Sequence, residues 1–364
     1  MSVHKSRITL LFFLLATQFA FGQSNPRAFR IRTITAGINI KDLTDTTRFS
    51  NAISFLKKAE KVYLAKGYEV QTLRIATQNF YNYANRQSYE EALAFLITLD
   101  KIAQRNYISF SIGQIINGDN YLPGIADWSV KLIQTTSKIS FSVPISSHTN
   151  GIYKQTIKAA AEIIIAISKN SEGGEGNFRF TAAANCPAGI PFFPAAYHEG
   201  TESFAIGLES PNLITEAFRT NDKENSKRNL TSILEAALHP IQEIAENISK
   251  MQKWKYDGID VSPAPGLDAS IGKAVETYTQ QPFGSPSTLS ACALITDVLK
   301  NLNIKKCGYS GLMLPVIEDK ILAQRAGEGR YSVQELLLYS SVSGTGLDVV
   351  PLPGNTTSNE IENI

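Results

Sequence analysis

The sequence predicts a single-domain α/β protein with a mainly parallel sheet. Short β-branched or apolar segments alternate with longer segments that carry apolar residues every three or four positions, as in successive βαβ units. The composition, 43% hydrophobic and 19% charged, is ordinary for a soluble globular protein. No linker long enough to separate two domains is found in the 364 residues.

The chain begins with the features of a secretory signal peptide. Two basic residues precede a short apolar run, 8–16, and the small residues Ala20 and Gly22 predict cleavage before Gln23. We therefore expect residues 1–22 to be removed and the mature protein to be exported to the periplasm or the extracellular space. An uncleaved anchor is the alternative, although the apolar run is short for a membrane span.

The first half of the chain is predicted to alternate strictly between strands and helices. The expected strands are 30–34, 68–76, 107–112, 139–145 and 178–184. The expected helices are 49–65, 90–103, 125–133 and 152–167. Strands that alternate with helices in this way favour right-handed crossovers and parallel pairing.

The second half is predicted to be richer in helices. The expected elements are a strand at 204–208, a long amphipathic helix over 230–244 with a kink at Pro240, an extended segment at 257–261, a helix from Ala269, a helix from Ser285 and Pro286 to Leu302, a strand at 308–314, and a helix that the capping box Ser332–Glu335 opens. Residues 355–364 are polar, and we expect them to form a disordered tail.

The segment from Asn185 to His198 is the most informative part of the chain. It contains an amide, a thiol, an imidazole and three prolines, and it directly follows an expected strand. Proline removes a backbone donor, so an ordinary helix or central strand is excluded here. We expect a stiff loop threaded into the interior, with Phe192 and Phe193 largely buried. Binding and catalytic groups concentrate on such loops.

Five motifs together resemble a known family. They are Asn185-Cys-Pro-Ala-Gly-Ile-Pro-Phe-Phe-Pro-Ala-Ala-Tyr-His198, Asp257-Gly-Ile-Asp260 with Ser262-Pro-Ala-Pro-Gly266, Phe283-Gly-Ser285, Cys307-Gly-Tyr-Ser-Gly-Leu-Met-Leu-Pro315, and Ser343-Gly-Thr-Gly-Leu-Asp348 with Pro351-Leu-Pro-Gly354. In this order they are similar to uncharacterised protein family 0210, also called domain of unknown function 711.

The resemblance implies a pyruvate formate-lyase-like fold. Residues 29–354 would then form one closed barrel of about ten strands, with helices outside and the 185–198 segment inserted as a finger loop. An open doubly wound sheet is the fallback. The family has no established reaction. The Arg-Val-x-Gly-aromatic signature of glycyl-radical enzymes and an adjacent cysteine pair are both absent from the sequence, which argues against radical chemistry.

Cys186 and His198 are the first candidate catalytic residues. If the imidazole lowered the pKa of the thiol, Cys186 would be a nucleophile. The alternative is a small apolar filler. His198 would act as a general base or contact a ligand, or it would simply brace the loop. The chain has three cysteines, and an exported protein with an odd number keeps at least one unpaired within the chain.

Asp260, Asp268 and Asp348 stand out among the acids because each lies near glycine or proline at an expected strand end or turn. Ligands collect at the carboxyl ends of parallel strands, so we expect Asp260 and Asp348 as catalytic candidates and Asp268 as a ligand contact. Their oxygens could also hold a divalent cation, although no spacing matches a known loop. Ordinary turn carboxylates are the alternative.

Three further residues are candidate ligand contacts. Asn185 opens the loop, and His148 follows an expected strand end. Arg330 lies in a glycine-rich turn before a capped helix, where free amides and the guanidinium could bind an anion. A plain turn between helices is the alternative for Arg330.

The function that the sequence favours is an exported enzyme that acts on a small polar substrate by acid/base or thiol chemistry. A small-molecule binding or sensor barrel without turnover is the alternative. A net charge of +2 and the lack of a dense Lys/Arg stripe speak against nucleic-acid binding. No membrane partner is expected after signal cleavage. The sequence leaves open the identity of any metal or cofactor, and also whether the protein forms a homo-oligomer.

Overall fold

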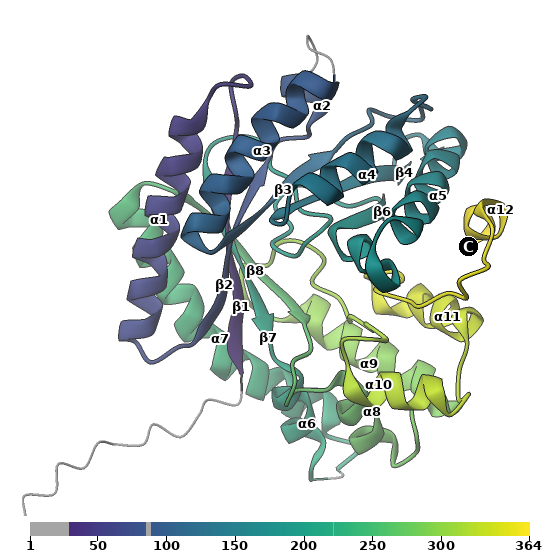
Figure 1. The fold of residues 1–364 in the computed structure, drawn as a ribbon. Helices are drawn as coiled ribbons and strands as arrows, with labels where there is room; N and C mark the ends of the chain where they lie inside the picture. The colour runs from purple at the N-terminus through teal and green to yellow at the C-terminus, as the bar shows by residue number, and fades with distance from the viewer. Residues whose placement is uncertain (1–28, 85–88, 221) are drawn as a thin grey trace, which may run out of the picture.

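A computed structural model describes residues 29–84, 89–220 and 222–364. It shows an α/β fold in which helices pack along one mixed β-sheet (Figure 1). The predicted signal peptide lies outside the described residues. No helix within the described ranges has both the length and the apolar character needed to cross a membrane.

Eight strands form the sheet. They are β1 (Arg30–Ile38), β2 (Val70–Thr77), β3 (Ile108–Gln114), β4 (Ile139–Ser147), β5 (Gly151–Ile152), β6 (Phe180–Ala184), β7 (Ser203–Glu209) and β8 (Lys255–Pro263). The order is β5-β4-β3-β2-β1-β7-β8, and β6 also pairs with β4. Strands β1, β2, β3, β4 and β6 are parallel, as are β7 and β8, whereas β1 and β7 pair antiparallel. The expectation of an α/β fold with a mostly parallel sheet is confirmed.

Helices account for most of the remaining chain. They are α1 (Thr46–Ala65), α2 (Tyr81–Ala84), α3 (Tyr89–Asn106), α4 (Ile125–Thr135), α5 (Lys154–Lys169), the 3-10 helix η1 (Glu172–Arg179), α6 (Pro211–Phe218), α7 (Ser226–Gln252), α8 (Ile271–Thr279), α9 (Ser287–Asn301), α10 (Lys320–Gly327), α11 (Val333–Ser343) and α12 (Ser358–Asn363). Helices α1, α3, α5 and α7 contact the strands, while α6, α8, α9 and α10 gather at one end of the molecule (Figure 1). The predicted capping box at Ser332 and Glu335 is confirmed at the start of α11.

The two faces of the sheet differ because residue size alternates along its strands. In β1, Ile34 and Ile38 belong to the apolar core, whereas Thr35 and Gly37 point to the opposite face. This alternation is what a period of two along a strand produces. The other central strands repeat it, with small residues at Ser109, Ser111, Gly113, Ser140, Ser142, Ser203, Ala205 and Gly207. One face therefore packs against helices. The other face carries small side chains, which leave room for a loop.

The loop between β6 and β7 occupies this second face. The Thr35 hydroxyl donates a hydrogen bond of 2.8 Å to the carbonyl of Pro191, and the amide of His198 donates one of 2.8 Å to the carbonyl of Thr77. Phe192 is 6% exposed, whereas Phe193 at the tip is only half-buried. Most of the loop from Ile190 to His198 is therefore buried against the sheet, whereas Phe193, which we expected to be largely buried, is not.

Two predictions about the chain need correction. Residues 308–314 are not a strand, because Gly308 and Ser310 have φ values of 61° and 43° and the loop amides bind a carboxylate instead of a neighbouring strand. The C-terminal residues are not disordered throughout: α12 begins with a capping box and packs on α5. Helix α7 contains Pro240 in its interior, and the kink expected there stays a prediction.

The sheet also differs in part from the expected barrel. It has eight strands in the described residues rather than about ten, and hydrogen bonds do not join its two edges. Beyond β8 the pairing continues only as a single parallel bridge between Ile259 and Lys306. The doubly wound alternative places helices on both faces of a sheet, whereas the inner face here carries the 185–198 loop across its centre.

Candidate functional site

A cavity of about 190 Å³ lies beside the tip of the finger loop. Its lining residues come from the amino-terminal parts of β2, β3 and β4, from the end of η1 and from the loop tip: they are Thr72, Arg74, Ser109, Ser137, Lys138, Ser140, Arg179 and Phe193. Hydroxyl groups and cations dominate this lining. No carboxylate belongs to it.

Arg74 is the central group of the cavity. It pairs with Ser109 of β3 in the parallel register, and such partners point to the same face of a sheet. Its guanidinium carbon lies 4.9 Å from the centre of the Phe193 ring. Burial, together with the nearby charge of Arg32, lowers the pKa of Arg74 to about 10. Among the described residues, the guanidinium has no hydrogen bond or ion pair.

Two more cations complete the lining. Arg179 ends η1 and donates hydrogen bonds to the carbonyls of Thr136 and Ile133, which fixes its side chain against the wall. Burial lowers the pKa of Arg179. Lys138 directly precedes β4, where its amide is held 2.7 Å from a carboxylate oxygen of Asp100, and its side chain is half-buried. The cavity thus brings three cations together.

Sequence reasoning missed this cavity, although a signal for it was present. Thr72, Arg74 and Ala76 share one face of β2, which is the face that carries small residues in the other strands. Helices do not cover this face, so an arginine there cannot lay its aliphatic stem along a helix and place its charge in water. Its presence therefore indicates a polar space inside the protein.

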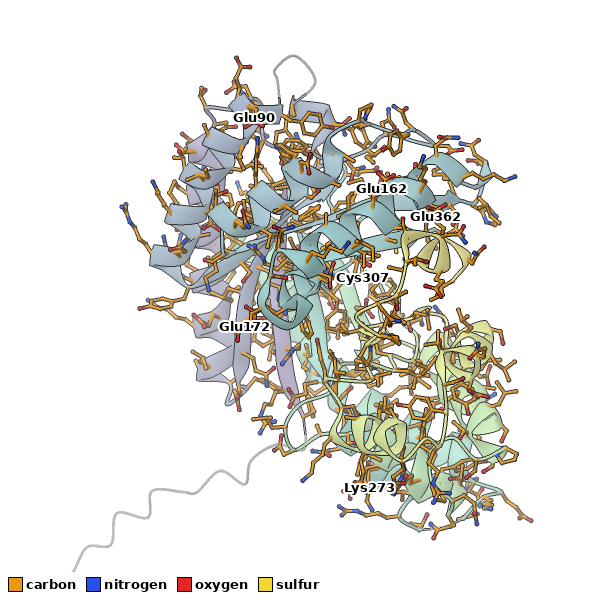
Figure 2. All side chains as sticks on the ribbon, turned by 45° about the vertical axis from the view of Figure 1, so that its right-hand side comes forward. Glu90, Glu162, Glu172, Lys273, Cys307 and Glu362 are labelled. Atoms are coloured by element: carbon orange, nitrogen blue, oxygen red, sulfur yellow. The ribbon has the colours of Figure 1, made fainter. Side chains whose placement is uncertain are left out.

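Cys186 lies near the entrance of the loop rather than at its tip. Its thiol is 3.8 Å from the hydroxyl of Tyr309 and 3.7 Å from the carbonyl of Ala184. Burial raises the pKa of the Cys186 thiol. No hydrogen bond between Cys186 and His198 is present in the described structure, so the expected thiol–imidazole pair is not assembled. All three cysteines are free, and Figure 2 shows Cys307 toward the middle of the molecule.

His198 is packed in the interior, with 2% of its surface exposed. Its Nδ1 lies 3.4 Å from the hydroxyl of Ser203, and burial lowers the pKa of the imidazole. A Cβ atom on Gly37 would lie 2.8 Å from the imidazole Cγ. The space left beside the ring is about 10 Å³, which holds at most one water molecule. The ring thus packs tightly against β1, while its buried Nε2 has no hydrogen-bond partner in the described structure.

Asp260 is fully buried and holds a loop in place. Its carboxylate accepts hydrogen bonds from the amides of Ser262, Tyr309 and Ser310 and from the Ser262 hydroxyl, at 2.6–3.0 Å. Burial raises the pKa of Asp260, and these four donors oppose the rise. With its oxygens occupied, Asp260 fixes the 307–311 turn against β8.

Asp348 reaches solvent although protein surrounds it on most sides. This environment, with the nearby charge of Glu318, raises the pKa of Asp348 to about 6. Glu318 also acts on Arg74, whose pKa it raises against the larger effect of burial. Asp348 does not line the cavity, but Glu318 links the two regions electrostatically.

The remaining predicted contacts lie elsewhere. Asn185 and His148 are exposed, at the end of β6 and in the turn after β4. Asp268 forms a two-pronged ion pair with Arg30 at 2.7 and 2.9 Å, which lowers the pKa of that carboxyl. Arg330 is exposed and lies 3.4 Å from Glu328.

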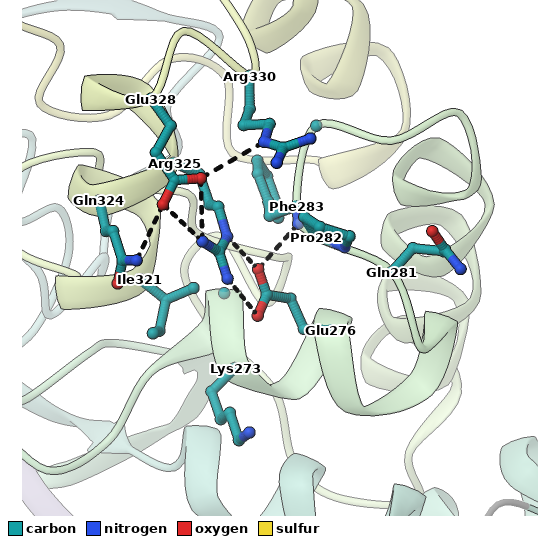
Figure 3. A network of polar contacts seen from close by, with 12 residues as sticks. Lys273, Glu276, Gln281, Pro282, Phe283, Ile321, Gln324, Arg325, Glu328 and Arg330 are labelled. Atoms are coloured by element: carbon teal, nitrogen blue, oxygen red, sulfur yellow. Dashed lines mark hydrogen bonds and ion pairs between the residues drawn. The ribbon is translucent and has the colours of Figure 1, made fainter.

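The surroundings of Arg330 are a surface network. Figure 3 shows Arg325 between Glu276 and Glu328, with Arg330 at the edge of the same group. Glu276 also accepts a hydrogen bond from the amide of Phe283. Arg325 and Glu276 tie α8 to α10 and to the turn before α9, and Arg330 joins this network only through Glu328.

The predicted site residues are therefore dispersed. Cys186 and Tyr309 meet, and Asp260 holds the same turn, but the cations of the cavity form a separate group. In the part of the chain that the structure describes, no three or more His, Cys, Asp and Glu side chains are grouped so that they could hold a metal ion.

Comparison with known proteins agrees with the resemblance seen in the motifs. The chain is 26% identical to a UPF0210 protein of Pyrobaculum aerophilum, over 92% of this chain and 80% of that protein. A UPF0210 protein of Actinobacillus pleuropneumoniae is 26% identical, and one of Methanocorpusculum labreanum is 25% identical, with the same coverage. The family model described as uncharacterised ACR (DUF711) matches residues 25–364. The chain therefore belongs to the DUF711 family, whose members carry the name UPF0210.

Proposed function

We propose that this protein binds a small anionic molecule in the cavity beside the tip of its finger loop. The observation that carries the proposal is Arg74, a half-buried cation that lines the cavity and has no hydrogen-bonded or ionic partner among the described residues. Loss of solvation makes an isolated cation costly, and proteins normally compensate it with a counter-charge. A bound anion would supply the missing charge.

The other lining groups suit the same ligand. Lys138 and Arg179 add positive charge, and the hydroxyls of Thr72, Ser109 and Ser140 can donate hydrogen bonds. The ring of Phe193 offers an apolar wall. A few convergent polar groups in a concave site are typical of small-molecule binding.

The wider architecture is proposed as a barrel closed by packing. Five parallel strands form one wall, β7 and β8 run in the opposite direction, and the finger loop crosses the face between them. The start of the sequence, which is basic and then apolar, resembles a secretory signal. We therefore propose that the protein binds its ligand outside the cytoplasm.

The proposal is tested by calorimetric titration of small anions, with Arg74→Met as the variant and Arg330→Gln as the matched control. One charge-assisted hydrogen bond contributes about 1.5–3 kcal/mol, so Arg74→Met should weaken binding by roughly 10- to 150-fold. Arg330 lies outside the cavity, so its variant should bind like the wild type. Failure of every anion to bind the wild type, or equal binding by Arg74→Met, would contradict the proposal.

An acid–base enzyme is the second candidate. It is favoured by Asp348, because a carboxyl with a pKa of about 6 can exchange a proton near neutral pH. The discriminating measurement is whether the bound molecule is converted by the wild type. Conversion that Asp348→Asn abolishes, with binding retained, would favour the enzyme, whereas binding without conversion would leave a binding protein.

A further inference from the structure

We infer that the cavity recognises a tetrahedral dianionic group, as carried by a phosphate or sulfate ester, rather than a simple carboxylate. The inference rests on the proposed function and narrows the class of anion. It follows from the number of charges in the lining, from the arrangement of the donors and from the size and opening of the cavity.

The charges in the lining favour a dianion. Arg74, Lys138 and Arg179 bring three positive charges, and no lining residue carries a negative one. Arg179 is partly compensated, because it donates to two backbone carbonyls. Glu318 acts on Arg74 and Asp100 on Arg179 from outside the lining, but neither carboxylate forms an ion pair with these cations in the described structure. Arg74 and Lys138 thus have no ionic partner there, so a monoanion would leave one of them unmatched. A dianion would match both.

The donors are also spread over several segments of the chain instead of belonging to one residue. Thr72 and Arg74 come from β2, Ser109 from β3, Ser140 from the start of β4, Lys138 from the residue before it and Arg179 from the end of η1. A planar carboxylate is satisfied by one two-pronged guanidinium contact. A tetrahedral group presents at least three oxygens in different directions, so it can accept from several strands at once.

Size and opening agree with a small group that carries an extension. The cavity of about 190 Å³ is below the usual range for drug-sized ligands, roughly 300–1,000 Å³. Ser137, at one side of the lining, is exposed to solvent. The organic part of an ester can therefore leave the cavity on that side while its anionic group stays beside Arg74.

The test compares inorganic phosphate, sulfate, acetate and malonate by calorimetric titration of the full chain at low ionic strength. Phosphate and sulfate should bind at least about tenfold more tightly than acetate, the difference expected from one additional charged contact. They should also bind more tightly than malonate, which carries two charges but places them on two planar carboxylates. Inorganic phosphate gains its second charge near pH 7, about one unit above a phosphate ester, so its affinity should rise roughly tenfold between pH 5 and pH 8.5, while that of sulfate stays constant. The relative affinities at pH 7.5 indicate whether a phosphoryl or a sulfuryl group fits better.

Lys138→Gln supplies the matched variant, and Lys131→Gln, which removes a cation paired with Glu90 outside the cavity, supplies the control. Lys138→Gln should weaken phosphate about tenfold and leave acetate nearly unchanged, because a monoanion needs only one cation. Equal or tighter binding of acetate or malonate would overturn the inference and leave the proposed anion site standing. Failure of all four anions to bind would overturn both.

Discussion

Replacing Gly37 by alanine tests the packing of the finger loop against the sheet. Gly37 lies in β1 without a positive φ, so alanine fits the backbone and only side-chain space decides the effect. The added Cβ would lie 2.8 Å from Cγ and 3.0 Å from Cε1 of His198, and closer still to Nδ1. Ordinary contacts between carbon atoms begin near about 3.5 Å. The imidazole would have to move by roughly one ångström to restore an ordinary contact with Nδ1.

The magnitude follows from how firmly the ring is held. His198 is buried and its amide is bonded to Thr77, so the ring cannot move away freely. Overpacking of this kind costs about 2 kcal/mol of unfolding free energy. His198→Ala should cost a similar amount by leaving a cavity. In the double variant the new methyl group occupies space that the ring has left, so the two costs should fall short of additivity by about 2 kcal/mol.

Chemical denaturation monitored by fluorescence and circular dichroism measures these changes as shifts of the midpoint at constant slope. Gly354→Ala is the control, because a Cβ there meets no atom within 4 Å, and it should stay within about 0.5 kcal/mol of the wild type. The reasoning is refuted if Gly37→Ala is as stable as the wild type, or if its cost is unchanged when His198 is already alanine.

Two further predictions concern the thiol and the leader. Burial raises the pKa of Cys186, so its alkylation by iodoacetamide should become appreciable only above about pH 8.5. The rate should be the same in His198→Ala. Rapid labelling at pH 7 that slows in this variant would instead support Cys186 as a nucleophile. The protein isolated from its native host should begin at Gln23, as N-terminal sequencing would show, and a cytoplasmic chain beginning at Met1 would contradict export.

The order of elements in the first half of the chain was predictable because each one carries a local signal. Apolar spacing marked α1, α3, α4 and α5, and β-branched runs marked the strands between them. The burial of the loop before His198 was predictable for a similar reason. Its prolines exclude regular structure, and many of the residues around them are apolar.

The errors arise where distant contacts override local pattern. Residues 308–314 are apolar enough for a strand, but Asp260 binds the amides of Tyr309 and Ser310 and turns the chain. Nothing local to 308–314 reveals a carboxylate some fifty positions away. The C-terminal helix α12 depends in the same way on its contact with α5, because a helix this short is marginal alone.

The candidate site was missed for a different reason. The predicted site consisted mostly of residues with chemically reactive side chains: a thiol, imidazoles and carboxylates. In the structure, Asp260 and Asp268 form contacts that hold the fold together. Arg74 gave a quieter signal, since it is recognisable only when the inward face of β2 is compared with those of β1 and β3. Register between strands is set by the fold as a whole, so that comparison needs the structure.

The most direct measurement of the central claim is the anomalous diffraction of crystals soaked in selenate, a tetrahedral dianion with a strong selenium signal. The account predicts an anomalous peak in the cavity, within hydrogen-bond reach of Arg74 and next to the Phe193 ring, that disappears in Arg74→Met crystals. A cavity that holds only water while selenate is ordered elsewhere on the protein would contradict the account.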